Sequence, residues 1–211
     1  MLGKLEKKRR YYASPYALYS KKVPLPGGWR ARLNFPEEAP LILEVGCGKG
    51  DFSLSVAQSE PQALVIGLDR KADRLYAAVR AAEMQRLANA YFWQGDALLL
   101  EAAFAPGEAS EIWLVHPDPY PKPRQAKHRL THPRFLRLYH RILRPGGLLH
   151  LRTDHEDLWR YSEEQLGIQG ARLLWSGIVQ SDKPATPWLM IETDFQRKKG
   201  GPTYYLQATW L

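Results

Sequence analysis

The sequence has little cysteine and no long hydrophobic stretch. Its 211 residues include one cysteine, Cys47, which excludes a disulfide framework and gives too few sulfur ligands for a zinc ribbon. No apolar run approaches the roughly 18 residues that span a bilayer, so we expect no membrane contact. The basic N-terminus lacks the apolar segment of a secretory signal. We therefore expect a cytoplasmic protein.

Acidic residues are scarce in two segments. Residues 1–35 hold nine Lys or Arg and one acid, Glu6, which accounts for the whole formal net charge of +8. We interpret 1–35 as a basic N-terminal arm and 36–211 as a main domain that is neutral overall. Residues 119–144 hold eight Lys or Arg and no acid. Both segments suit a polyanionic partner, although the arm alone is also compatible with a solvated tail kept for solubility.

Hydrophobic runs alternate with helical patterns along the main domain. The runs at 41–45, 63–68, 91–94, 112–116 and 148–153 predict buried strands, and 51–58, 72–87 and 133–143 predict helices between them. Two further strands are expected at 171–180 and 202–210. This order predicts an α/β fold with a mostly parallel, doubly wound sheet.

The most informative motif is a glycine-rich turn with carboxylates around it. Glu44 precedes Gly46, Gly48 and Gly50, where the first strand meets the first helix. The spacing fits neither a phosphate-binding Walker loop nor the dinucleotide fingerprint, and the charge of Glu44 favours a cationic ligand over a pyrophosphate. Three later strands end at or near an acid, and ligands of such sheets bind at the carboxyl ends of the strands. These acids are Asp69, Asp96 and Asp118.

These residues resemble the S-adenosylmethionine site of class I methyltransferases. The segment Pro117-Asp118-Pro119-Tyr120-Pro121-Lys122, the basic run after it and Thr153-Asp154 narrow the resemblance to the tRNA (guanine-N7)-methyltransferase family. The resemblance implies a seven-stranded Rossmann-like sheet and transfer of a methyl group from S-adenosylmethionine to guanine N7 in the tRNA variable loop, position 46 in tRNA nomenclature. Gln196 stands where the family has Glu, and Tyr120 where it usually has Trp.

The resemblance also implies roles for individual residues. Cofactor contacts are expected at Glu44, Gly46, Gly48, Gly50, Asp69, Asp96 and Asp118. Substrate contacts are expected at Lys122, Asp154, Thr193, Asp194, Phe195 and Gln196, with Asp118 and Asp154 as the catalytic candidates. We expect RNA contacts at Arg124, Lys127 and Arg129, tRNA as the partner, no metal and no obligatory protein partner, with monomer and homodimer both open. Deleting residues 1–30 is expected to weaken tRNA binding and leave cofactor binding intact.

Two other functions stay open at this point. An amino-group methyltransferase acting on another nucleic acid or on protein often carries Asn-Pro-Pro-Tyr after the fourth strand, which Asp118-Pro119-Tyr120 resembles only in part. A non-catalytic RNA-binding protein with the same fold is the second alternative. Binding of S-adenosylmethionine discriminates against the latter.

Overall fold

The computed structural model describes residues 2–19, 26–179, 187–191, 193 and 201–210, and its core is one eight-stranded sheet. The strand order is β1-β4-β3-β2-β5-β6-β8-β7, with β8 antiparallel to both of its neighbours and the other pairs parallel. The strands are β1 (Ala17–Leu18), β2 (Leu41–Val45), β3 (Leu64–Asp69), β4 (Ala90–Gln94), β5 (Ala109–Val115), β6 (Leu143–Thr153), β7 (Arg172–Ile178) and β8 (Tyr204–Thr209). The predicted fold class is confirmed.

The predicted number of seven strands is wrong by one. The additional strand, β1, contains two residues and lies within the segment that the sequence assigned to the basic arm. It pairs with β4, where Ala17 faces Phe92 and Leu18 faces Trp93. Two residues are too few to show the alternation that identifies a strand, so the hydrophobic pattern gave no signal for it.

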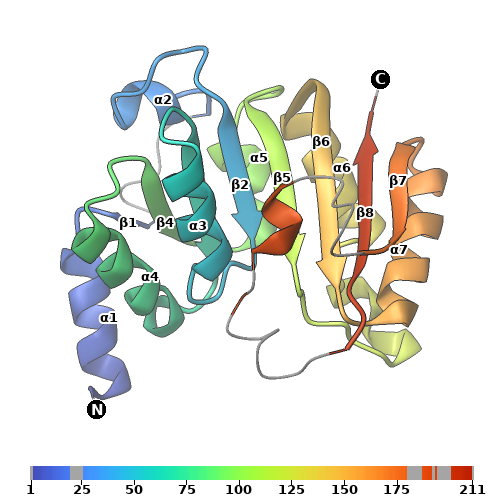
Figure 1. Cartoon of the computed structure of the whole chain (residues 1–211), viewed down its shortest axis with the longest axis horizontal. Coiled ribbons are helices and arrows are strands. Elements are labelled where there is room, and N and C mark those ends of the chain that lie inside the picture. Colours follow the sequence, from blue (N-terminus) through green and yellow to red (C-terminus); the bar gives the residue numbers. More distant parts are fainter. Residues whose placement is uncertain (1, 20–25, 180–186, 192, 194–200, 211) are drawn as a thin grey trace.

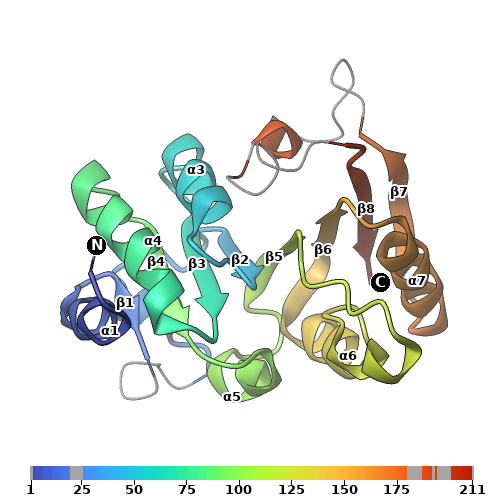
Figure 2. The ribbon, with the colours of Figure 1, turned by 90° about the horizontal axis from the view of Figure 1, so that it is seen from below.

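Helices cover both faces of the sheet (Figure 1; Figure 2). One face carries α3 and α4, with α1 beside them at the β1 edge, and the other carries α5, α6 and α7. The α-helices are α1 (Lys4–Ala13), α2 (Trp29–Arg32), α3 (Asp51–Ser59), α4 (Ala72–Gln85), α5 (Leu100–Ala103), α6 (Pro133–Ile142) and α7 (Glu156–Ile168), and the 3₁₀ turns are η1 (Ala97–Leu99), η2 (Pro123–His128) and η3 (Pro187–Met190). None of the helices described here has the length and apolarity needed to cross a membrane.

The strand side chains alternate between two hydrophobic cores. In β2, Leu41, Leu43 and Val45 pack into the core under α5 and α6, whereas Ile42 packs into the core under α3 and α4. This two-residue period is the one expected of strands buried on both faces. It places the ends of β2, β3, β4 and β5 at one edge, where the predicted carboxylates follow.

The basic segment 1–35 is attached to the sheet through its described residues. Tyr11 and Trp29 are fully buried. The Tyr11 hydroxyl donates to the carbonyl oxygens of Leu18 (2.6 Å) and Phe92 (2.8 Å), and it accepts a hydrogen bond from Gln94 N (2.9 Å). The indole Nε1 of Trp29 donates to Ala103 O at 2.8 Å. These aromatic residues therefore hold the segment against the main domain.

Candidate active site at the carboxyl ends of the strands

The glycine turn is hydrogen-bonded to the end of β3. Gly46 N and Cys47 N both donate to Leu68 O, at 2.8 and 3.0 Å, and Gly50 N donates to Cys47 O at 2.8 Å. Gly46, Gly48 and Gly50 all have positive φ angles, which residues other than glycine rarely adopt. A Cβ on Gly50 would lie 2.7 Å from the Ala78 Cβ, so this glycine also permits close packing of α3 on α4.

Gly48 is different, because a Cβ there would meet no atom within 4 Å. Its backbone faces open space at the edge of the sheet, and its N–H donates to Asp69 Oδ2 at 3.1 Å. The other oxygen of Asp69 accepts from Lys71 N at 2.8 Å. The turn and the carboxylate at the end of β3 thus form one unit at this edge of the sheet. Each carboxylate oxygen keeps a lone pair for a ligand hydroxyl, so the pair fits the ribose of a nucleoside cofactor.

Glu44 is buried beneath the turn, with 3% of its surface exposed. Its Oε2 accepts hydrogen bonds from Ser53 N (3.1 Å) and from the Ser53 hydroxyl, which joins β2 to the start of α3. Burial raises the pKa of Glu44 to about 7, against the hydrogen bonds from Ser53 and the positive charge of Arg152. Such burial favours an electrostatic action of Glu44 on a cationic ligand, together with support of the turn, over direct contact at its surface.

Asp96 and Asp118 are the more accessible acids. Asp96 caps η1 by accepting from Leu98 N at 3.0 Å, and its second oxygen lies 3.4 Å from Arg70 Nε. Because Arg70 follows Asp69, this ion pair places Asp96 beside the end of β3. Asp118 is exposed in the loop after β5. The structure therefore gathers Glu44, the turn, Asp69 and Asp96 closely and leaves Asp118 at the rim.

The loop after β5 has an unusual backbone. His116 and Tyr120 have φ angles of 45° and 44°, in the left-handed region that non-glycine residues rarely occupy. Strain of this kind persists only when neighbouring contacts enforce it, and it concentrates at functional sites. His116 Nδ1 lies 3.4 Å from Asp154 Oδ1, so the loop after β5 and the residue after β6 meet here.

Arg129 is buried and holds this loop in place. Its Nε donates to Pro119 O (3.1 Å) and Tyr120 O (3.2 Å), its Nη2 also donates to Tyr120 O (3.1 Å), and its guanidinium lies 4.3 Å from the centre of the Tyr161 ring. These contacts give Arg129 a positioning role, whereas direct contact with an RNA phosphate requires an exposed guanidinium. Lys122, Arg124 and Lys127 are exposed, as RNA contacts must be.

No motif in the sequence indicates a role for Arg152. This arginine is fully buried near the end of β6, and its Nη1 donates to Ile191 O (2.8 Å), Leu189 O (3.1 Å) and Trp188 O (3.5 Å). Burial lowers its pKa to about 10, and the charge of Glu44 opposes that shift. Arg152 thereby ties the segment 187–191 to the sheet, directly before the buried Thr193. The other predicted substrate contacts, Asp194, Phe195 and Gln196, lie outside the described residues.

Comparison with known proteins identifies relatives of the chain. A family model described as a putative methyltransferase matches residues 38–197. The tRNA (guanine-N(7)-)-methyltransferase of Christiangramia forsetii is 36% identical over 152 residues, which are 72% of this chain and 67% of that protein. The one from Pediococcus pentosaceus is 32% identical over 93% of this chain and 92% of its own.

Solved structures agree on the fold. The 16S rRNA (adenine(1408)-N(1))-methyltransferase from Catenulisporales acidiphilia aligns with a TM-score of 0.60 at 16% identity, over all of this chain and 94% of that one. The chain therefore has the fold of a class I methyltransferase. The sequence matches show further that the chain belongs to the tRNA (guanine-N(7)-)-methyltransferase family.

Proposed function

We propose that the chain transfers a methyl group from S-adenosylmethionine to N7 of the guanine at position 46, in the variable loop of tRNA. The observation that carries this proposal is the joined unit of the glycine turn and Asp69, which fits a nucleoside cofactor, in a chain whose relatives are named tRNA (guanine-N(7)-)-methyltransferases. The exposed cations after Asp118 supply contacts for the RNA backbone.

The bound cofactor supplies an electrophilic methyl group on a sulfonium. Glu44, Gly46, Gly48, Gly50, Asp69 and Asp96 are the residues that would hold it. Guanine N7 carries a free lone pair at neutral pH, so this reaction needs no general base. The protein must align N7 with the methyl group and exclude water, and alignment of this kind accounts for up to about 7 to 11 kcal/mol in intramolecular models.

Asp154 and Asp118 are the candidates for stabilising the transition state. The guanine becomes cationic as the methyl group arrives, and a carboxylate favours that developing charge or accepts hydrogen bonds from the guanine N1 and amino group. Asp154 lies beside His116, which helps to fix its orientation. Lys122 is exposed before η2, which is compatible with a contact to a phosphate or to the guanine O6.

The direct test is product identification. Unmodified tRNA is incubated with the protein and labelled S-adenosylmethionine, then digested to nucleosides. We expect labelled 7-methylguanosine, mapped to position 46. Another methylated nucleoside, or binding of tRNA without methylation, would replace the proposed function with one of the alternatives.

A variant of Asp154 tests the catalytic assignment. We expect Asp154→Ala to lower kcat by roughly 10²- to 10³-fold, the range for removal of a group that stabilises developing charge, with little change in the Kd for S-adenosylmethionine. Single-turnover methylation and calorimetry measure the two quantities. Equal turnover by the variant and the parent protein contradicts the assignment.

A further inference from the structure

A groove separates the N-terminal helix α1 from α4. It has a volume of about 400 Å³ and is lined in part by Arg10 and Ser14 on one side and by Tyr76, Arg80 and Glu83 on the other. The predicted cofactor and substrate contacts lie elsewhere, at the ends of the strands. The groove is thus a feature that the proposed chemistry does not use.

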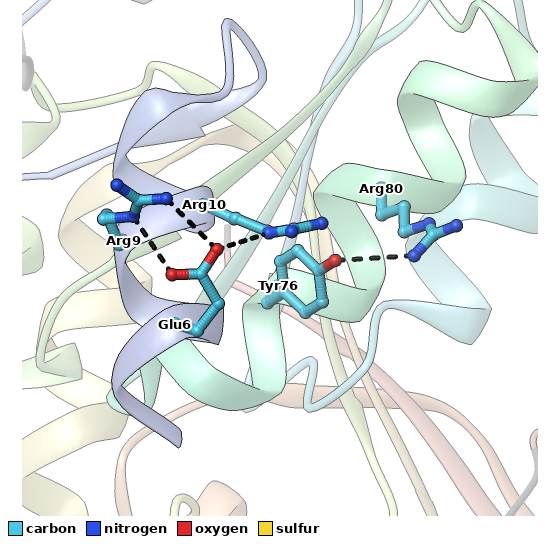
Figure 3. Close-up of polar contacts among 5 residues, drawn as sticks. All are labelled: Glu6, Arg9, Arg10, Tyr76 and Arg80. Carbon is cyan, nitrogen blue, oxygen red and sulfur yellow. Dashed lines mark hydrogen bonds and ion pairs between the residues drawn. The ribbon is translucent and has the colours of Figure 1, made fainter. Parts of the chain in front are cut away.

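Two arginines from different helices converge on one tyrosine in this groove. Arg10 reaches from α1 across to Tyr76 on α4, and Arg80 Nη1 donates to the Tyr76 hydroxyl at 3.5 Å (Figure 3). The hydrogen bonds from Arg80 and Arg10 lower the pKa of Tyr76. The hydroxyl therefore lies in a positive potential that both helices create.

The positive charge around Tyr76 is only partly compensated. Glu6 accepts hydrogen bonds from both Arg9 (3.1 and 3.3 Å) and Arg10 (2.7 Å), so one carboxylate is shared by two guanidinium groups, while Arg80 lies on the other side of Tyr76 (Figure 3). Glu83 accepts from the Ser14 hydroxyl at 2.6 Å. Guanidinium groups held close together attract an anion with several acceptor oxygens, and a phosphate matches their planar donors.

One wall of the groove, α1, is attached to the sheet by the contacts of two tyrosines. Tyr11, next to Arg10, is anchored to β1 and β4 through its hydroxyl, and Tyr12 donates from its hydroxyl to Gln94 Oε1 at 2.7 Å. These contacts fix the backbone of α1 beside α4, so Arg10 and Arg80 are presented from two helices whose positions are set by the fold.

The position of the groove suits a long polyanion that passes over the active site. Helix α1, whose C-terminal end lines the groove, lies at the β1 edge of the sheet, and the basic segment between β5 and α6 lies farther along the side toward which β2 points (Figure 1; Figure 2). Two cationic surfaces thus flank the carboxyl ends of the strands. An RNA that presents one base between them would reach both.

We propose that Arg10, Arg80 and Tyr76 form a binding site for a backbone phosphate of the tRNA, remote from the base that is methylated. The proposal rests on the proposed function for its choice of RNA. It assigns to α4, a helix of the main domain, a part in RNA binding that no sequence motif indicates. Loss of the site weakens tRNA binding without impairing the methyl transfer itself.

The test compares the double variant Arg10→Gln/Arg80→Gln with Arg172→Gln. Arg172 is exposed on β7, at the opposite end of the sheet, and its loss lowers the charge without touching the groove. For the double variant we expect roughly 5- to 20-fold weaker tRNA binding and a slope of log Kd against log salt that is smaller by about 1.4 to 1.8. The KM for tRNA should rise with kcat unchanged, and Arg172→Gln should resemble the parent protein.

Further arms separate the remaining explanations. Arg10→Lys/Arg80→Lys should keep the salt slope, and thermal unfolding checks that each variant folds. Unchanged tRNA affinity and slope in the double variant overturn the proposal. A second result also overturns it: inorganic phosphate raises the Tm of the parent protein but not that of the double variant, while both proteins bind tRNA equally well. The groove would then bind free phosphate and not the RNA backbone. If the parent protein binds tRNA through the groove but forms no 7-methylguanosine, the proposed function fails and the phosphate site stands.

Discussion

Glu44 shows how burial and function oppose each other at a single residue. Its pKa of about 7 in the folded protein exceeds the ordinary value of 4.5 because burial disfavours the charged form. The folded state therefore binds this proton more tightly than the unfolded state does. The stability that Glu44 contributes is complete below about pH 4.5 and falls as the pH rises through about 7.

Replacing Glu44 with Gln separates stability from cofactor binding. At pH 8 we expect Glu44→Gln to have a higher free energy of unfolding than the parent protein, by up to about 3 kcal/mol, because a neutral amide avoids the cost of ionisation. Urea titration measures this difference. In the parent protein, affinity for S-adenosylmethionine should increase from about pH 6 to about pH 8 as the carboxylate forms. The variant should bind weakly at both values. Calorimetry across this range checks it, and a parallel pH dependence in the two proteins contradicts the role of Glu44.

Arg152 on β6 permits a similar separation of effects. Arg152→Met leaves the carbonyl oxygens of Leu189 and Ile191 without this donor and removes the charge that faces Glu44. A loss of roughly 2 to 5 kcal/mol in unfolding free energy is expected. Arg152→Lys keeps the charge but not the planar donors, so we expect it to restore stability in part. If the segment 187–191 positions the substrate, kcat falls in both variants more than cofactor affinity does.

The sequence predicted the chemistry of these residues better than their surroundings. The spacing of Glu44, the glycines and Asp69 was sufficient to place them together, because strand ends of a parallel sheet meet at one edge. The sequence had no means of showing that Arg129 and Arg152 bind backbone carbonyls, since their partners follow from loop paths. A basic residue in a basic run looks the same whether its side chain is buried or exposed.

At the scale of elements, the buried hydroxyl of Tyr11 is one of the contacts that attach α1 to the sheet. Tyr11 contributes three hydrogen bonds at the junction of α1, β1 and β4. Tyr11→Phe keeps the ring but leaves the Gln94 N–H without this acceptor. We expect a cost of about 1 to 3 kcal/mol and faster amide exchange over residues 4–13. Exchange measured by mass spectrometry checks this, and unchanged protection of α1 contradicts it.

Strands and helices of the main domain were predicted well for a physical reason. β2 is predicted at 41–45 and found at Leu41–Val45, because a short apolar run between Pro40 and Gly46 leaves few alternatives. α1 was missed because it is rich in Lys and Arg and packs mainly through its few aromatic residues. A charged segment without a stripe of apolar residues predicts a solvated arm and not a packed helix.

At the scale of the whole molecule, this attachment revises the expectation for the N-terminal deletion. Removing residues 1–30 also removes Tyr11, Ala17, Leu18 and Trp29 from the two cores. We now expect a lower midpoint of urea unfolding and weaker cofactor binding as well as weaker tRNA binding. Urea titration and calorimetry of the truncated chain check this, and unaltered stability contradicts the docking of the segment. Charge substitutions on α1 are the cleaner probe of RNA binding.

The pairing of β1 with β4 has a consequence for solubility. Ala17 and Leu18, together with the bond from Phe92 N to Tyr16 O at 2.9 Å, occupy backbone groups on the outer side of β4. If proteolysis released this short strand, an apolar strand would be left with open donors and acceptors, and such rims recruit strands from other molecules. The N-terminal segment thus also protects the chain from aggregation.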